Sequence, residues 1–277
     1  MDWKEMLPTL YRNRIDTVFS GEGDSVPVGG SRFGGRPDVP GDFVWPVFEW
    51  EGTTRPLAFL AQFDCAQLAP LDKEGLLPKK GLLSFFYELD SQRWGYDPKD
   101  AGCARVYWFE GQDLAPAEFP AELAEDFRLP QLAAKLSAAT DAPDFQDACP
   151  ALGYPWTAND YRIFDQARRE LGMHYPENRS QLLGWPDLIQ NNMTLQCELV
   201  SRGHYLGGSW ESVPLEERDQ LRGPSTEKWR LLFQLDTVEQ DGFELMFGDC
   251  GRIYFYIPKE DLEAGRFDRV WLIQQSA

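Results

Sequence analysis

The chain has 277 residues, of which 43% are hydrophobic and 14% aromatic, so it can bury a large core as a globular protein. Its 27 basic and 45 acidic residues give a net charge of −18, which disfavours binding to nucleic acid or to anionic lipid surfaces. The acidity indicates either a well-solvated surface or attraction to a basic partner.

The cysteines and the hydropathy pattern indicate the compartment. The five cysteines are scattered singly with no CxxC pair, so neither a zinc ribbon nor a full disulfide framework fits. We interpret them as reduced core thiols, and we expect no metal and no cofactor. Residues 1–16 show no apolar run after a basic start, and no stretch approaches the roughly 18 apolar residues of a membrane span. A cytoplasmic location is therefore expected.

A short N-terminal helix is expected first, and a first β unit follows over about residues 27–112. GGRPDVP, at residues 34–40, has the glycines and prolines of a rigid turn. It lacks the Lys-Ser/Thr pair of a Walker phosphate loop. Arg36 in this turn is either a carboxylate clamp or an ordinary surface residue that forms a salt bridge.

The clearest strand signal of this unit is LAFLAQFD at residues 57–64, in which side chains alternate between two faces. Asp64 is followed three residues later by Gln67, which predicts a helix cap at the end of the strand. Gln62 lies on a mostly buried strand and needs hydrogen-bond partners. Its amide either ties the sheet to the Gly-x-Pro-Asp turn of the same unit or contacts a ligand in a cleft.

A helical connector is predicted over about residues 113–177. APAEFPAELAEDF at 115–127 and LPQLAAKLSAA at 129–139 are rich in Ala, Leu and Glu. TANDYRIFDQARREL at 157–171 has apolar residues at helical spacing, with Thr157 as a cap. Prolines within 143–156 are expected to break the run.

The second β unit, about residues 178–275, repeats motifs of the first in the same order. SQLLGWPDLI at 180–189 matches SRFGGRPDVP at 31–40, WRLLFQLD at 229–236 matches LAFLAQFD, and GRIYFYIP from position 251 matches GLLSFFYE from position 81. Gln234 and Asp236 therefore correspond to Gln62 and Asp64. The Gln234 amide either ties the sheet to its own Gly-x-Pro-Asp turn or contacts a ligand, and Asp236 is expected to cap a helix. Residues 190–192 are expected to form a turn before a strand at 194–200, and 208–228 is an insertion.

Three matches in the same order indicate an internal duplication. The predicted fold class is α+β, with one domain over 1–277. It contains two mixed, largely antiparallel β-sheet units in a pseudo-twofold relation, joined by the helical connector. The junction between the units is the expected cleft.

No reactive constellation identifies a reaction. His174 and His204 are the only histidines, with neither an HExxH motif nor a nearby Cys pair, and there is no GxSxG elbow. Carboxylates are abundant enough for an acid/base pair, and several tryptophans could stack on sugars if exposed: Trp45, Trp94, Trp185 and Trp210. Most tryptophans are expected to fill the core. Whether the protein is an enzyme stays open, with the balance against catalysis.

Several motifs in a fixed order carry a family resemblance from about residue 27 to 275. They are SRFGGRPDVP with the following Trp-Pro, PLAFLAQFD, LPKKGLLSFFY, LLGWPDLIQNNM, WRLLFQLD and FGDCGRIYFYIPKEDL. Together they resemble the YwqG-like family of bacterial proteins, a family of unknown function. The resemblance implies a soluble α+β protein with an internal duplication and no established reaction or cofactor. Some relatives occur in settings that suggest toxin neutralisation, which would suit an acidic protein facing a basic toxin.

Two functions are expected from these observations. The first is a non-catalytic cytoplasmic binding protein that engages a basic protein partner. The second is a small-molecule or carbohydrate-binding protein, or a hydrolase, with its site in the cleft between the two units. The expected binding residues of that cleft are Arg36, Trp45, Gln62, Gln190, Gln234 and Asp249.

Overall fold

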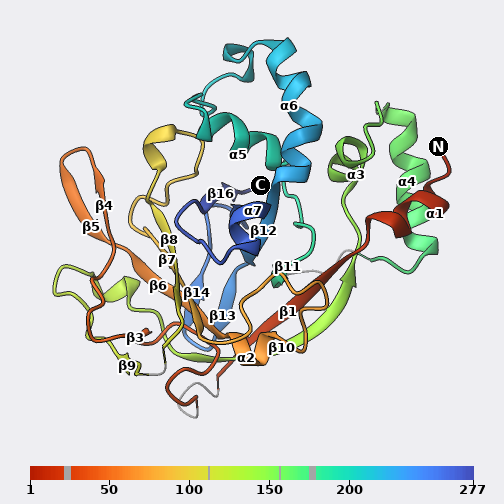
Figure 1. The fold of residues 1–277 in the computed structure, drawn as a ribbon. Coiled ribbons are helices and arrows are strands. Elements are labelled where there is room, and N and C mark those ends of the chain that lie inside the picture. Colours follow the sequence, from red (N-terminus) through yellow and green to blue (C-terminus); the bar gives the residue numbers. More distant parts are fainter. Residues whose placement is uncertain (22–25, 112, 156, 175–178) are drawn as a thin grey trace.

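A computed structural model describes residues 1–21, 26–111, 113–155, 157–174 and 179–277 of the chain (Figure 1). The α-helices are α1 (Trp3–Met6), α2 (Cys65–Leu68), α3 (Phe145–Ala151), α4 (Ala158–Glu170), α5 (Thr194–Ser201), α6 (Leu215–Lys228) and α7 (Lys259–Glu263). Short 3-10 turns occur at Leu7–Leu10, Pro98–Asp100, Glu125–Phe127 and Trp210–Ser212.

Over the described residues, ten strands form one sheet in the order β16-β15-β12-β11-β1-β10-β2-β6-β7-β8. These strands are β1 (Arg12–Ser20), β2 (Arg32–Phe33), β6 (Ala58–Asp64), β7 (Leu82–Tyr87), β8 (Ala104–Phe109), β10 (Leu132–Asp141), β11 (Ser180–Leu183), β12 (Trp229–Leu235), β15 (Arg252–Pro258) and β16 (Trp271–Gln275). Their pairing is antiparallel throughout. The fold is therefore α+β with mostly antiparallel sheets, as predicted.

The remaining strands form two-stranded ribbons. They are β3 (Asp38–Val39) with β9 (Ala115–Pro116), β4 (Val47–Trp50) with β5 (Thr53–Pro56), and β13 (Val238–Gln240) with β14 (Phe243–Leu245). The β4–β5 hairpin projects from the body of the molecule (Figure 1).

The middle of the large sheet is formed by β1 and β10, and β10 corrects a sequence prediction. The sequence predicts a helix over 129–139, but Leu132–Asp141 pairs with β1 from Arg12↔Asp141 to Ser20↔Ala133. Ala, Leu and Lys favour a helix over other residues by only about 0.7 kcal/mol each or less. The long ladder outweighs this preference because it satisfies backbone groups that would otherwise lie unpaired inside the sheet.

Other local predictions are also wrong. Residues 194–200 form α5 rather than a strand, because a continuously buried run has no period that distinguishes the two. Residues 115–127 contain β9 and one 3-10 turn instead of a helix, since Pro116 and Pro120 interrupt it. The expected break at 143–156 contains α3, with Pro150 inside it. No helix follows Asp236, whose carboxylate accepts from the Thr237 N–H just before β13.

The other helix signals are confirmed. The N-terminal helix is α1, and α4 begins with a capping box between Thr157 and Asp160. Asp64 caps α2 by accepting from the Ala66 N–H at 2.9 Å. All five cysteines are free, and four are buried as expected, whereas Cys250 is exposed.

One aromatic core joins the two halves of the sheet. Phe85 on β7 packs against Phe233 on β12, with ring centroids 4.8 Å apart, and against Phe255 on β15 at 5.3 Å. Phe63 on β6 also contacts Phe233 at 5.2 Å. These strands are far apart in the sheet order, so the sheet curls around the four buried rings into a nearly closed, barrel-like form.

The edge strands β8 and β16 leave a gap in this barrel, here called the seam, and residues 91–97 bridge it. The Gln274 N–H donates to the Trp94 carbonyl at 3.0 Å, and the Trp271 indole N–H donates to the Gly95 carbonyl at 2.9 Å. Gly95 has φ 78°, and a Cβ there would lie 1.8 Å from the Leu272 carbonyl oxygen. Only glycine fits this close approach.

Two groups of helices flank the sheet (Figure 1). α1, α3 and α4 surround a small core of their own, which includes Trp3, Phe145 and Phe164. α5 and α6 pack against each other beside β12. Within the described residues, no helix is both long enough and apolar enough to cross a membrane.

Candidate functional site

Gln62 is fully buried and uses its amide inside the first unit. Its Oε1 accepts from the Asp38 N–H at 3.0 Å, and its Nε2 donates to the Gly30 carbonyl at 2.9 Å and to Asp38 Oδ2 at 2.7 Å. Arg32 donates to the same carboxylate oxygen at 2.7 Å. The amide therefore ties β6 to the Gly-x-Pro-Asp turn, which is the structural alternative inferred from the sequence.

Gln234 makes the equivalent bonds in the second unit and is also fully buried. Its Oε1 accepts from the Asp187 N–H at 2.9 Å, and its Nε2 donates to the Arg179 carbonyl at 2.7 Å and to Asp187 Oδ2 at 3.2 Å. The Arg179 guanidinium donates to Asp187 Oδ1 at 2.5 Å. The geometry around both glutamines is thus internal and offers no ligand-facing atom.

The two aspartates that receive these bonds differ in their charge balance. Burial acts to raise the pKa of Asp38, but hydrogen bonds from Arg32, the Gly29 N–H and Gln62 outweigh it and hold that pKa below its ordinary value. At Asp187 burial outweighs the attraction of Arg179, so its pKa is raised.

Arg36 and Trp45, two further predicted binding residues, lie apart from the glutamines. Arg36 is exposed and pairs with Glu118. Trp45 donates its indole N–H to the Leu57 carbonyl at 2.9 Å and packs edge-on against Phe86, with ring centroids 5.7 Å apart. Trp45 is therefore partly buried, with its indole N–H bonded to the backbone.

Gln190 and Asp249, the remaining predicted residues, lie near the C-terminus. Gln190 is exposed, and its Nε2 donates to the Ser276 carbonyl at 2.8 Å. Asp249 is exposed, and its carbonyl accepts from the Ala277 N–H at 2.9 Å. The structure does not gather the six predicted residues into one pocket.

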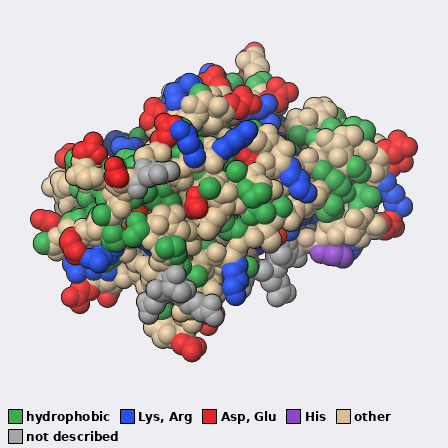
Figure 2. All heavy atoms as spheres, turned by 60° about the horizontal axis from the view of Figure 1, so that its bottom comes forward, with side chains coloured by type: hydrophobic (Ala, Val, Ile, Leu, Met, Phe, Trp, Pro, Cys, Tyr) green, Lys and Arg blue, Asp and Glu red, His purple; other side chains and the backbone are tan. Residues whose placement is uncertain are grey.

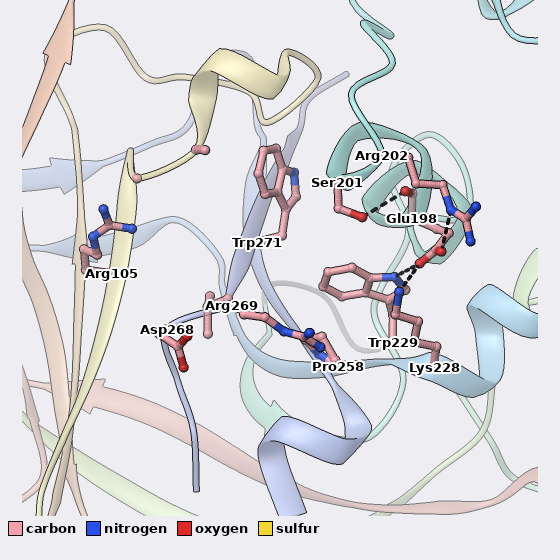
Figure 3. Close-up of a pocket in the computed structure, with 13 residues that line it drawn as sticks. Arg105, Glu198, Ser201, Arg202, Lys228, Trp229, Pro258, Asp268, Arg269 and Trp271 are labelled. Atoms are coloured by element: carbon pink, nitrogen blue, oxygen red, sulfur yellow. Dashed lines mark hydrogen bonds and ion pairs between the residues drawn. The ribbon is translucent and has the colours of Figure 1, made fainter. Parts of the chain in front are cut away.

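A cavity of about 490 Å³ lies at the seam, between the two halves of the sheet (Figure 3). Its walls come from the start of β8, from α5, from the junction of α6 with β12, and from the segment that leads into β16. Its charged lining residues are Arg105, Glu198, Arg202, Lys228, Asp268 and Arg269. Four cations against two carboxylates make this seam pocket basic, although the chain as a whole has a net charge of −18.

Glu198 organises one wall of the seam pocket. It accepts from Arg202 at 2.8 Å, from Lys228 at 2.7 Å and from the Trp229 indole N–H at 2.9 Å. Burial acts to raise the pKa of Glu198, but these hydrogen bonds outweigh burial and hold the pKa below its ordinary value. The single Glu198 carboxylate therefore pairs with both Arg202 and Lys228, which leaves this wall with an excess of positive charge.

The facing wall contributes a cation and an aromatic ring. Arg105 projects from β8 on the side opposite Arg202 (Figure 3), is exposed, and forms no ion pair within the described part of the chain. Arg269 is compensated by Glu260 and Asp261. Trp271 is half-buried, and its indole N–H is fixed on the Gly95 carbonyl, so its ring forms a rigid surface beside the cavity.

These groups suit the binding of an anion better than catalysis. A guanidinium such as that of Arg105, which has no ion-pair partner among the described residues, matches the planar oxygens of a carboxylate or phosphate. The only hydroxyl side chain among the described lining residues, Ser201, donates to the Glu198 carbonyl. Over the described ranges, no group of three or more His, Cys, Asp or Glu side chains is arranged to hold a metal ion.

Sequence reasoning anticipates a cleft at the junction of the halves but misses the residues of the seam pocket. The lining comes from five separate parts of the chain, around positions 105, 200, 228, 258 and 270. The nearest sequence signal is Lys228-Trp229 at the start of the repeated WRLLFQLD strand, and it does not show which cations would face it.

The surface shows a different pattern from the pocket. On the face in Figure 2, acidic side chains lie mainly along the margins, while hydrophobic and uncharged ones occupy the middle. Residues 110–126, here called the acidic segment, contain no basic residue. Its exposed carboxylates are Glu110, Asp113, Glu118, Glu122, Glu125 and Asp126.

The comparisons with known proteins give a family and no activity. A family model described as "Domain of unknown function (DUF1963)" matches residues 31–275. The match includes both halves of the sheet and the seam pocket between them. The comparison with curated proteins gave no match.

Proposed function

The chain belongs to the DUF1963 family, whose description gives no function, and we propose that it is a non-catalytic cytoplasmic protein that binds a small anionic molecule. The seam pocket is the binding site. The observation that carries this proposal is the basic lining of a cavity in a strongly acidic protein.

Electrostatics supports this assignment. The lining carries four cations and two carboxylates, and a cleft with an excess of positive charge between low-dielectric walls attracts anions. The cavity of about 490 Å³ lies within the range of roughly 300–1,000 Å³ typical of small-molecule sites. Arg105 would bind the carboxylate or phosphate of the ligand, and a planar part would lie against Trp271.

The test uses defined anions and one arginine. Thermal shift and calorimetry with inorganic phosphate, citrate, benzoate and AMP should show stabilisation and saturable binding by at least one of them. Arg105→Ala should weaken that binding about tenfold or more, since hydrogen bonds to charged groups contribute about 1.5–3 kcal/mol each. Arg105 forms no ion pair in the described chain, so its loss should leave the fold intact.

Arg36→Ala is the matched control, because it removes the same charge from an exposed site outside the seam pocket. It should leave the affinity unchanged. Binding of none of the four anions, or equal weakening by both substitutions, would exclude a specific anion site at the seam.

A second candidate function is the binding of a basic protein, and the acidic segment favours it. We propose that Glu122, Glu125 and Asp126, which are exposed and form no ion pair within the described residues, face such a partner. Like charges gathered in one segment attract a basic surface and speed association at low salt. A toxin-neutralising role would use this surface.

The test is co-purification from bacterial lysate at low and high salt. The triple variant Glu122→Lys, Glu125→Lys and Asp126→Lys should lose a basic partner that the wild type retains at low salt, because salt screens exposed charges. A control triple variant on α6, with Glu216, Asp219 and Glu227 changed to Lys, should retain it. Salt-insensitive capture, or loss in both triple variants, would contradict this candidate.

We further propose that the two halves arose by duplication, as the repeated motifs predict. The strands β2, β6, β7 and β8 mirror β11, β12, β15 and β16 in the sheet order. The ladder is irregular at Leu60 of β6 and at Leu232 of β12, two residues before each buried glutamine. Membership of the YwqG-like family stays a prediction from the sequence motifs.

A further inference from the structure

A second pocket, of about 330 Å³, lies along the bridging segment 91–97, and two exposed aromatic rings line it. Trp94 is 59% exposed and Tyr205 is 55% exposed. By contrast, Trp185 and Trp229 are almost fully buried. Aromatic faces left open to water beside a cavity indicate a binding surface.

Backbone hydrogen bonds hold together the segments that carry the two rings. The Trp94 carbonyl accepts from the Gln274 N–H at 3.0 Å, and the Leu206 N–H donates to the Tyr96 carbonyl at 2.8 Å. In Figure 1, the loop before β8 lies beside the loop after α5, in agreement with this second bond. The two rings are therefore attached to segments held together before any ligand arrives, which lowers the entropic cost of binding.

Gly207 shapes the tyrosine side of the pocket. A Cβ at position 207 would lie 2.6 Å from the Tyr205 hydroxyl oxygen and 2.8 Å from the ring carbon that carries it. The Tyr205 ring therefore lies close against the backbone of Gly207, and a larger residue there would displace it. This packing leaves the rest of the ring exposed.

The polar groups of this pocket carry no free cation. Arg93 donates to Asp100 at 2.7 Å, and its guanidinium lies 3.7 Å from the centroid of the Trp50 ring. Asp97 is half-buried, and its carboxylate accepts from the Lys99 N–H and, within the capping box of the 3-10 turn, from the Asp100 N–H. Gln92 accepts from the Gly248 N–H at 3.2 Å, and its Nε2 has no partner among the described residues. An anionic ligand would meet Asp97 without compensation, so the chemistry favours a neutral ligand.

The backbone of Gln92 fixes where its side chain leaves the chain. Its φ of 44° lies in the left-handed region, and Gln92 is the last residue of the turn formed by residues 89–92. The Gln92 amide therefore has a defined position at the edge of the pocket.

We propose that this pocket binds a pyranose ring of a neutral carbohydrate. A pyranose has an apolar face of C–H groups that suits Trp94 and Tyr205, and hydroxyls at its edge that suit Asp97 and Gln92. A purely apolar ligand would leave those polar groups unpaired. This site is separate from the seam pocket, and it does not depend on the anion-binding function proposed for that pocket.

In the experiment, the full chain is titrated with cellohexaose, maltohexaose, chitohexaose and xylohexaose, and binding is measured by calorimetry and by tryptophan fluorescence. We expect saturable binding of at least one of them. Trp94→Ala and Tyr205→Ala should each weaken it about tenfold or more, and Trp94→Phe should weaken it less because an aromatic face remains. Thermal unfolding confirms that each variant folds.

Two controls separate this site from other surfaces. Tyr161→Ala removes a similarly exposed tyrosine from α4, and Arg105→Ala alters the seam pocket; both should bind the sugar as the wild type does. Absence of binding of all four hexasaccharides at their solubility limits overturns the proposal. Wild-type affinity in Trp94→Ala and Tyr205→Ala overturns it as well.

Discussion

At the scale of single residues, Asp147 of α3 is a buried carboxyl group with few partners. Asn192 donates to its Oδ1 at 2.5 Å, and its Oδ2 has no partner among the described residues. Burial, and then the charge of Asp144, raise the pKa of Asp147 from an ordinary 3.8 to about 7. Ionised Asp147 is therefore unfavourable in the folded protein at neutral pH.

We predict that Asp147→Asn stabilises the protein at pH 8 but not at pH 4. Between about pH 4 and 7 the folded state keeps this proton and the unfolded chain loses it, so wild-type stability falls as pH rises. Asn retains the acceptor for Asn192 and cannot ionise, so its gain should reach about 1–4 kcal/mol above pH 7. Urea unfolding of the wild type and of Asp147→Asn at pH 4 and pH 8 measures this difference in the free energy of unfolding. An equal gain at both, or the same gain from Asp113→Asn on the surface, would contradict the assignment.

The buried glutamines give a second residue-scale prediction. Gln62→Leu should destabilise the protein by about 2–5 kcal/mol, because the Asp38 N–H and the Gly30 carbonyl lose their partner at about 1–3 kcal/mol each. Gln234→Leu should cost a similar amount for the equivalent reason. Chemical denaturation of both variants measures these changes. Gln166→Leu, on the exposed face of α4, is the control and should stay within about 0.5 kcal/mol.

At the scale of elements, β10 tests whether tertiary pairing decides the structure of a helix-favouring sequence. Lys135 is exposed and lies directly opposite Val18, which is 61% exposed on β1. We predict that Lys135→Ile stabilises the protein by about 0.2–1 kcal/mol, because it creates an apolar cross-strand pair. Thermal and urea unfolding measure the change.

Arg162→Ile on α4 is the matched control, since it removes the same charge from an exposed position of a true helix. It should destabilise slightly, because β-branched residues lose side-chain freedom in a helix. Destabilisation by Lys135→Ile to the same extent would indicate that residues 132–141 are helical in solution.

The elements show what the sequence can and cannot predict. α4 and the caps at Thr157 and Asp64 were predictable because their signals are local. The strand β10 was not predictable, since its partner β1 lies more than a hundred residues earlier in the chain and its residues favour a helix. The helix α5 was not, because it is buried on nearly all sides and shows no period.

The candidate sites divide in the same way. The bonds of Gln62 and Gln234 to the Gly-x-Pro-Asp turns were one of two alternatives predicted from the sequence, because each motif supplies its own turn. The basic seam pocket was not predictable, because Arg105, Lys228 and Trp271 meet only after the sheet curls. Trp94 stood out by type alone, and its exposure could be learned only from the fold.

At the scale of the whole molecule, the chain crosses between its halves in a way that joins them. β1, from the N-terminus, pairs with β11 of the second half, whereas β10, from the connector, pairs with β2 of the first half. The Phe85 ring of the first half contacts the Phe233 and Phe255 rings of the second. Separation of the halves would therefore expose one shared core and break the continuous sheet between them.

We predict that the protein unfolds in a single transition even after its chain is cut in the connector. A protease site inserted between Ala121 and Glu122 lies at an exposed position, and cleavage leaves β1 on one fragment and β10 on the other. The long β1–β10 ladder and the shared aromatic core should keep the fragments associated, so they should co-elute in gel filtration and melt together at a lower temperature. The control is a protease site at the exposed tip of the β4–β5 hairpin, between Glu51 and Gly52. Protein cut there should unfold at nearly the same temperature as the uncut protein. Two separately folded fragments, or two melting transitions after the cut at Ala121, would mean that the halves are independent domains.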